Sequence, residues 1–174
     1  MANSPRNLPN ILITGTPGVG KSTVCQKLAE ITDMVWVDVG KLAKDKGCLE
    51  SYDEEYQCSV LDEDKVLDEM EDMMDEGGKI VDYHGCDFFP ERWFDAIFVL
   101  RTDNTVLYDR LAIRGYSTKK LEENIQSEIF QVILEEAKES YEPEIVHELQ
   151  NNTSEELEKN ITDIKNWIEA WKNK

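Results

Sequence analysis

A glycine-rich octapeptide near the amino end constrains the fold of this chain more than any other segment. Residues 15–22 read Gly-Thr-Pro-Gly-Val-Gly-Lys-Ser and satisfy the pattern G-x-x-x-x-G-K-[ST]. An apolar run at 10–14 precedes the loop and predicts a buried strand, and residues 21–31 predict a helix. Glycines let successive backbone N–H groups turn inward, and the amino end of the helix adds a positive dipole. The segment is therefore expected to bind a polyphosphate.

Two side chains of this loop have expected roles of their own. Lys21 is expected to bridge the β- and γ-phosphates of a nucleotide, and the Ser22 hydroxyl is a candidate Mg²⁺ ligand. The other loop residues complete the predicted nucleotide-binding set: Gly15, Gly18, Val19, Gly20 and Thr23. The alternative is a plain glycine-rich turn, but the strand before the motif and the helix after it favour a phosphate loop.

The rest of the chain alternates short apolar runs with amphipathic stretches, which predicts one α/β domain spanning 1–174 with a five-stranded parallel sheet. Further strands are expected at about 34–38, 79–83, 96–100 and 145–149. Helices are expected at about 62–76, 105–114, 118–140 and 154–172. The stretch 39–61 is expected to be irregular apart from a short helix at 41–46. The helix at 118–140 would bury the apolar stripe Leu121, Ile125, Ile129, Val132 and Ile133.

A carboxylate ends the predicted strand at 79–82. Asp82 stands where phosphate-loop proteins place the acid that holds Mg²⁺, so Asp82 and Ser22 form the predicted metal site. His84 lies two residues further and shares the face of Asp82 if the strand continues. His84 is a candidate to orient or deprotonate a water molecule, and its alternative is a loop histidine bonded to the backbone.

Two arginines stand four residues apart on the helix predicted at 105–114. Arg110 and Arg114 therefore share one face, and planar guanidinium groups neutralise phosphoryl groups well. Arg114 directly precedes Gly115, a candidate hinge at which a lid would begin. The alternative is a solvated helix end whose arginines pair with acids such as Asp109.

The charge of the chain excludes broad nucleic-acid binding. The formal net charge is −18, and residues 45–76 alone carry 14 acidic and two basic side chains. Such a surface repels phosphate backbones. The acidic stretch either docks a basic partner or is a solvated face. No apolar run approaches the length of a membrane span, and the four cysteines lack zinc-site spacing and are expected to be free thiols.

Four blocks of the sequence together resemble one family. Residues 15–23, 52–56, 82–94 and 100–102 look like the corresponding segments of adenylate kinase isoenzyme six, also called the coilin-interacting nuclear ATPase protein family. The resemblance implies a three-layer P-loop NTPase fold with a region that binds nucleoside monophosphate (NMP) at about 38–61 and a short lid at about 113–123. It places the ATP base near 151–153 and the monophosphate near Gly40 and Lys44, where Lys44 replaces the usual arginine of the family.

The resemblance also implies a function. The family transfers phosphate from ATP, bound with Mg²⁺, to AMP and less well to other monophosphates, and it hydrolyses ATP through the residues matching Asp82 and His84. Lys21 and Arg114 would join them as catalytic residues. The family also acts in small-ribosomal-subunit maturation and rRNA processing, where it binds a small-subunit ribosomal protein with a basic tail. We accordingly expect a monomer in nucleus and cytoplasm. The alternative is primarily an ATP-switched assembly factor with secondary kinase activity.

Overall fold

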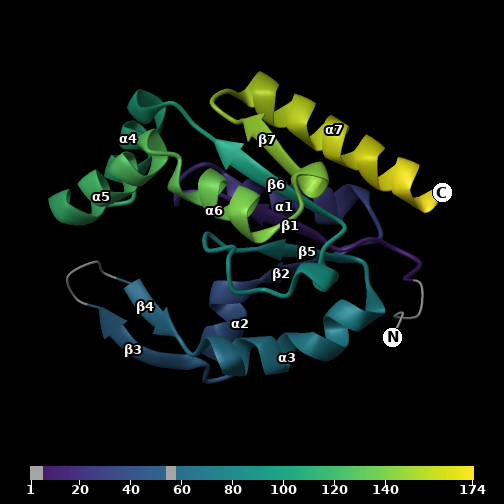
Figure 1. The fold of residues 1–174 in the computed structure, drawn as a ribbon. Coiled ribbons are helices and arrows are strands. Elements are labelled where there is room, and N and C mark those ends of the chain that lie inside the picture. Colours follow the sequence, from purple (N-terminus) through teal and green to yellow (C-terminus); the bar gives the residue numbers. More distant parts are fainter. Residues whose placement is uncertain (1–5, 54–57) are drawn as a thin grey trace.

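The central sheet has five parallel strands, as the sequence predicts. The computed structural model describes residues 6–53 and 58–174 (Figure 1). The strands lie in the order β2-β5-β1-β6-β7. Their bounds are β1 Ile11–Thr14, β2 Val35–Asp38, β5 Lys79–Asp82, β6 Ala96–Arg101 and β7 Val146–Gln150. Because β1 lies between β5 and β6, the loop that follows it emerges at the middle of the carboxyl edge of the sheet.

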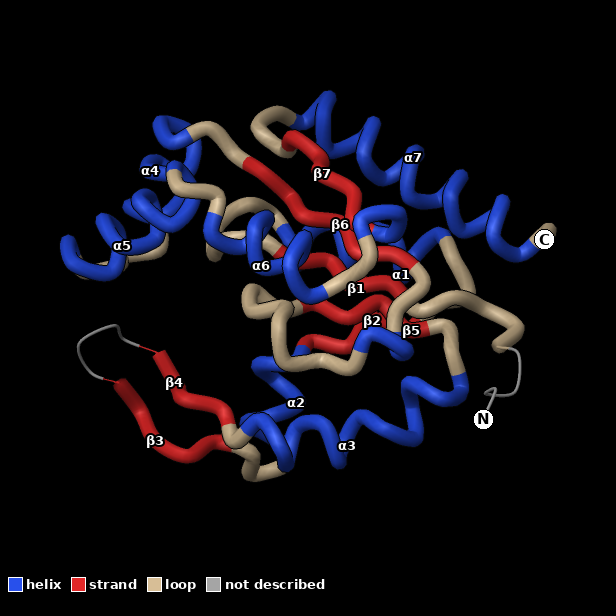
Figure 2. The backbone as a smooth tube through the Cα atoms, in the orientation of Figure 1, coloured by secondary structure: helices blue, strands red, loops and turns tan. Residues whose placement is uncertain are grey.

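Helices cover both faces of this sheet (Figure 2). Alternate residues of β1 supply the two cores: Ile11 and Ile13 pack in one core cluster, and Leu12 packs in the other. The first cluster includes α1 (Lys21–Ile31), α4 (Asn104–Ile113) and α7 (Ser154–Lys172). The second includes α2 (Val39–Asp45), α3 (Glu63–Glu76) and α6 (Val132–Ser140). The three-layer α/β prediction is confirmed, and α3 buries Val66, Met70 and Met74.

The single helix predicted at 118–140 is wrong, because the structure has two. Helix α5 spans Thr118–Ile129 and α6 begins at Val132. Between them Gln131 takes a left-handed φ of 58°, which no regular helix contains. The turn rotates the predicted stripe, so Ile129 is 52% exposed and Val132 is 39% exposed. Neither glycine nor proline marks this break in the sequence.

The stretch 39–61, expected to be largely irregular, contains helix α2 and a β-hairpin. Strand β3 (Leu49–Asp53) pairs antiparallel with β4 (Cys58–Leu61) in a separate two-stranded sheet. Residues 54–57, part of the predicted NMP region and of the family block at 52–56, lie outside the described residues. Figure 1 shows the hairpin projecting from the body beside α2 and across from α5, so it forms one wall of the carboxyl edge of the sheet.

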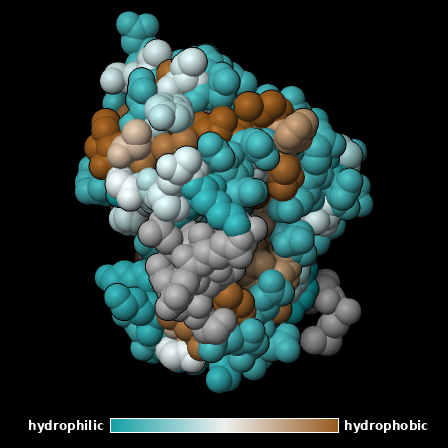
Figure 3. Space-filling view, turned by 90° about the vertical axis from the view of Figure 1, so that its left-hand side faces the viewer, coloured by the Kyte–Doolittle hydropathy of each residue, from teal (hydrophilic) through white to brown (hydrophobic). Residues whose placement is uncertain are grey.

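The remaining surface has few unusual features. Figure 3 looks onto the side with α4, α5 and the hairpin, and shows apolar surface gathered in its upper half. The most exposed large apolar residues of α4 and the α5–α6 junction are Ile113 (87%) and Phe130 (72%).

None of the described helices is long and apolar enough to cross a bilayer. Cys25, Cys48 and Cys86 are buried free thiols, while the side chain of Cys58 lies outside the description.

Candidate nucleotide-binding site

The glycine-rich loop turns from β1 into α1 with a geometry that only glycine allows. Gly15 has φ 148°, and a Cβ there would lie 2.7 Å from the backbone oxygen of Leu100. Gly20, the residue before α1, has φ 102°, and a Cβ there would lie 2.5 Å from Nδ2 of Asn151. No side chain caps α1 at this end. The first amides of the helix therefore remain available to an anion.

Lys21 lies folded over the loop. Its Nζ donates to the backbone oxygens of Gly15 at 2.9 Å and Thr16 at 3.3 Å. Burial, opposed by Asp82 and assisted by Arg114, lowers the pKa of Lys21 to about 8. The ammonium group therefore remains largely charged at neutral pH, although few water molecules solvate it. A bound polyphosphate would relieve that loss of solvation.

Ser22 and Asp82 lie together, as the sequence predicts. The Ser22 hydroxyl donates to Asp82 Oδ2 at 3.2 Å, and the Trp36 indole N–H donates to the same oxygen at 3.1 Å. Burial raises the pKa of Asp82, and Lys21 opposes this shift. A hydroxyl and a carboxylate are oxygen donors of the kind Mg²⁺ prefers, and Mg²⁺ usually keeps waters and substrate phosphates as its other ligands. The residues present thus fit the metal that this loop implies.

His84 lies on the same cavity as Lys21, two residues beyond β5. Its imidazole ring contacts the ring of Tyr83 at 4.3 Å between centroids. The pKa of His84 is lowered to about 4. Loss of surrounding water is the main cause, and the positive charges of Lys21 and Lys120 also contribute. The imidazole is therefore neutral at pH 7 and can accept a proton. The negative charge of a bound polyphosphate would make it a stronger base.

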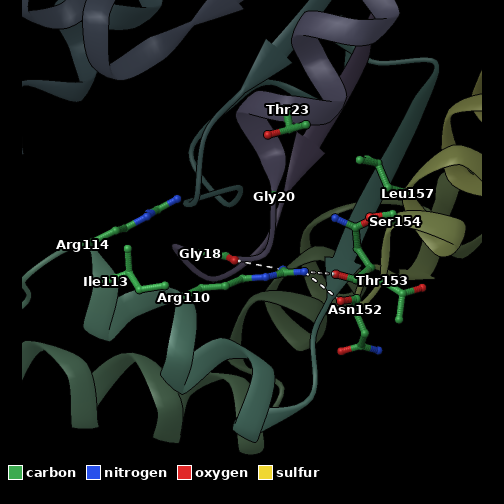
Figure 4. Close-up of a pocket in the computed structure, with 11 residues that line it drawn as sticks. Gly18, Gly20, Thr23, Arg110, Ile113, Arg114, Asn152, Thr153, Ser154 and Leu157 are labelled. Carbon is green, nitrogen blue, oxygen red and sulfur yellow. Dashed lines mark hydrogen bonds between the residues drawn. The ribbon is translucent and has the colours of Figure 1, made fainter.

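Arg110 binds backbone atoms of two loops. Its guanidinium donates to Gly18 O at 3.2 Å, Asn151 O at 3.1 Å and Asn152 O at 3.0 Å, with a longer contact of 3.4 Å to Thr102 Oγ1. Figure 4 shows the side chain extended between the glycine-rich loop and the segment before α7. Arg110 was predicted to contact the nucleotide, and the structure places it in the wall of a cavity with these donors occupied by the protein.

Arg114 differs from its neighbour one turn earlier. It is exposed at the carboxyl end of α4, and its one hydrogen bond to another described residue is a marginal 3.5 Å contact from Nη1 to the Tyr116 hydroxyl. In Figure 4 it extends toward the glycine-rich loop. Most of its donors are therefore available to a ligand. Of the two predicted arginines, Arg114 is placed to contact phosphate and Arg110 to position the loops.

Asn151 completes the phosphate loop from the far end of the chain. Its Nδ2 donates to Val19 O at 2.7 Å, and its Oδ1 accepts from Asn160 at 3.3 Å. The Val19 side chain is fully buried, so this predicted site residue contributes backbone atoms only. Thr23 and Thr153 line the cavity beside Asn151, where the base was expected. The loop before α7 therefore fixes the carboxyl half of the glycine-rich loop.

Glu128 fixes the other half of the loop and was not predicted. It is 3% exposed and accepts from the Thr16 hydroxyl at 3.0 Å, from Arg101 Nε at 3.0 Å and from the Thr102 amide at 2.8 Å. A glutamate on the inner face of an otherwise apolar stripe, three residues after Ile125, was the available signal.

Three cavities meet at the glycine-rich loop. The first, of about 470 Å³, lies between α4 and the segment before α7, and it shares Gly18 and Arg114 with a second of about 430 Å³ that faces α5. The second shares Lys21, Ser22 and His84 with a third of about 290 Å³. Gly40 lines this third cavity, whereas Lys44 is exposed on α2 and does not line it. Through these shared residues the three cavities lie next to one another, from the expected base site to the expected monophosphate site.

Comparison with known proteins agrees with this arrangement. A family model described as an AAA domain matches residues 11–131. The chain is 54% identical over 166 residues to the adenylate kinase isoenzyme 6 homolog of Drosophila melanogaster, covering 95% of each chain. It is 53% identical over 161 residues to that of Caenorhabditis elegans, covering 91% of this chain and 88% of the other. The fold is similar to shikimate kinase from Acinetobacter baumannii, with a TM-score of 0.65 at 16% identity and 96% coverage of each.

Proposed function

The chain belongs to the adenylate kinase isoenzyme 6 family, and on that premise we propose that it transfers the terminal phosphoryl group of Mg·ATP to AMP, yielding two ADP. The names of its relatives support an adenylate kinase. The observation that carries the proposal is the row of three adjacent cavities, which offers room for a donor base, a polyphosphate and an acceptor. A protein that only hydrolysed ATP would not need the third cavity.

The donor nucleotide would occupy the first two cavities. Its base would lie between Ile113 and Thr153, and its phosphates would receive the open amides of α1. Lys21 would leave the Gly15 and Thr16 oxygens and donate to the β- and γ-phosphates. Arg114 would neutralise the transferred group from the opposite side. Arg110 would join the two loops that line this site at a fixed distance from each other.

Ser22 and Asp82 would hold Mg²⁺. The ion supplies charge neutralisation on the phosphate oxygens. An oxygen of the AMP phosphate then attacks the γ-phosphorus, and the bond from that phosphorus to the β–γ bridging oxygen breaks. Because the phosphoryl group passes directly from ATP to AMP, without a covalent intermediate on the protein, the protein contributes only position and charge. Exclusion of water from the second cavity would favour transfer over hydrolysis.

The acceptor cavity favours a broad choice of monophosphate. Gly40 and Leu61 line it beside two carboxylates, Asp38 and Asp82. Lys21 is its cationic side chain among the described lining residues. An acceptor held by one shared lysine, without the bidentate grip of an arginine, would be weakly selected. We therefore propose that AMP binds with modest affinity and that CMP and dAMP are also accepted.

Hydrolysis of ATP is the second proposed activity. His84 lies where a water molecule in the second or third cavity would be within its reach, and it is neutral at pH 7. With the acceptor site empty, His84 would accept a proton from that water as it attacks the γ-phosphorus. Asp82 assists through the metal site it shares with Ser22.

Coupled measurement of products tests the proposed function. ADP formation is followed with ATP alone and then with AMP, CMP or dAMP added, and phosphate release is followed in parallel. Strong stimulation of ADP formation by AMP, without a matching rise in phosphate, is the expected result. Equal ADP and phosphate under all conditions would show hydrolysis alone and would exclude the kinase.

One surface favours a second role as an ATP-switched assembly factor. The outer face of α3 exposes Glu63, Asp64, Asp68, Glu69, Asp72, Asp75 and Glu76. This face would attract a basic polypeptide at long range. We propose a small-subunit ribosomal protein with a basic tail as the partner, in small-subunit maturation and rRNA processing, with the protein in nucleus and cytoplasm. Binding that does not weaken as salt rises, or a partner that leaves ATP hydrolysis unchanged, would contradict this role.

A further inference from the structure

We propose that Trp36 is a positioning residue: its indole N–H holds the Asp82 carboxylate beside Ser22 and so sets how strongly nucleotide binding depends on Mg²⁺. The inference rests on the proposed function insofar as Asp82 and Ser22 serve a metal. Trp36 belongs to β2, whereas Asp82 ends β5 and Ser22 is the second residue of α1. Three separate elements therefore converge on one carboxylate oxygen.

The contact geometry points to orientation of the carboxylate. Oδ2 of Asp82 accepts from both Trp36 Nε1 at 3.1 Å and Ser22 Oγ at 3.2 Å. No hydrogen bond to Oδ1 occurs among the described residues. Two donors on one oxygen fix the plane of the carboxylate and leave the other oxygen for a ligand. Loss of one donor would let the group rotate about its Cβ–Cγ bond.

The electrostatic setting explains why Asp82 needs this second donor. Asp82 is 5% exposed, and in the parallel register of β2 and β5 it stands opposite Asp38. A buried carboxylate beside a second acid is costly unless donors surround it. An indole N–H donates but cannot accept or carry charge, so it supports the carboxylate without competing for a cation.

Packing of the Trp36 ring fixes the direction in which its N–H points. Trp36 is half-buried and packs against the core cluster that contains α1. It also lines an outer cavity of about 460 Å³ with Val35, Leu42 and Met73. The competing explanation is that the indole only packs and that the carboxylate merely satisfies its N–H.

Substitution Trp36→Phe separates these explanations, because it removes the N–H and keeps an aromatic ring. ADP binding is measured by calorimetry with Mg²⁺ and with EDTA. We expect the gain in affinity that Mg²⁺ gives to fall about tenfold, with the affinity in EDTA unchanged. An unchanged gain would overturn the proposal. A wild-type protein that binds no ADP would instead overturn the proposed function, so the two failures are distinct.

Trp167→Phe is the matched control. Trp167 is also half-buried, and it lies on α7 with its ring edge toward Phe98 at 5.9 Å. Thermal unfolding of both variants measures lost packing, which should be similar. Only Trp36→Phe should change the Mg²⁺ dependence. If both variants change it equally, the effect is general loosening and the proposal fails. Trp36→Met provides a second variant should Trp36→Phe not fold.

Intrinsic fluorescence gives a readout that does not need activity. Adding Mg²⁺ to the ADP-bound wild type should change the emission of Trp36, because the carboxylate it contacts gains a cation. Trp167→Phe should keep this change and Trp36→Phe should lose it. A full response in Trp36→Phe would place the reporting indole elsewhere and would contradict the proposal.

Discussion

The donor side and the acceptor side of the cleft are built differently. On the donor side, Arg110, Asn151 and Glu128 each join the glycine-rich loop to an element distant in sequence. On the acceptor side, β3 and β4 pair with each other outside the central sheet, and α2 and α3 present mostly exposed acids and lysines to solvent. Figures 1 and 2 show this hairpin standing clear of the sheet.

This difference indicates how selective each side of the cleft is for its ligand. A polyphosphate must be held in one geometry for in-line transfer, so its site is tied together by buried hydrogen bonds. On the proposed function, the acceptor side has fewer such ties and would admit several monophosphates. Donor binding and acceptor binding would then be separate properties, and each could be perturbed alone.

Lys21→Met should produce the largest effect, because Lys21 lines both the donor and the acceptor cavities. Transfer to AMP and hydrolysis of ATP should both fall about 1,000-fold. Initial rates of ADP and phosphate formation measure the two losses, and circular dichroism controls for folding. Retained turnover in either assay would mean that the two sides do not share this cation.

His84→Ala should separate hydrolysis from transfer. Hydrolysis should fall about 100-fold because the attacking water loses its proton acceptor, whereas transfer to AMP, whose phosphate is already ionised, should change by less than about threefold. The ratio of phosphate to ADP at saturating AMP measures the difference. His147→Ala is the control, since His147 stacks on Phe98 away from the cleft. Equal losses in both activities would refute the division of labour.

Arg110→Ala should damage the donor side alone. Without its donors to Gly18, Asn151 and Asn152, the two loops separate and ATP affinity should fall about thirtyfold. The KM for AMP should stay within about twofold of the wild-type value if the two sides are independent. Steady-state kinetics with each substrate varied in turn gives both constants. A parallel rise in the KM for AMP would show that the donor side and the acceptor side are not independent.

Raising the pH should weaken ATP binding through Lys21. Its pKa of about 8 lies below that of an ordinary lysine, and the protonated form is the one that binds phosphate. Between pH 7.5 and 9 the protonated fraction in the free protein falls, so ATP affinity should drop about eightfold. Calorimetry at constant ionic strength measures this. A flat profile over this range would show that Lys21 stays charged.

Lys44→Ala should produce the smallest effect, although the resemblance places the monophosphate near this residue. Lys44 is exposed and outside the acceptor cavity, so the KM for AMP should rise by less than about threefold. Lys41→Ala on the same helix is the control for lost surface charge. A rise of tenfold or more would mean that α2 moves Lys44 into the cavity when AMP binds.

The sequence predicts the sheet and the donor loop well because both depend on local patterns. Apolar runs identify β1, β5 and β6, and the spacing of Gly15, Gly20 and Lys21 identifies the loop. The hairpin β3–β4 was missed because its acids hide any alternation of apolar and polar residues. The break at Gln131 was missed because neither a glycine nor a proline marks it in the sequence. The contact of Trp36 with Asp82 was missed because it depends on how β2 pairs with β5, which the sequence does not show.

The contact of Asn151 with the glycine-rich loop also determines when, during synthesis, the chain can begin to bind nucleotide. The amide of Asn151 reaches the loop across 132 positions of chain. A ribosome must therefore have added residue 151 before the loop gains this support. We expect a nascent chain to hold nucleotide poorly until the segment before α7 emerges.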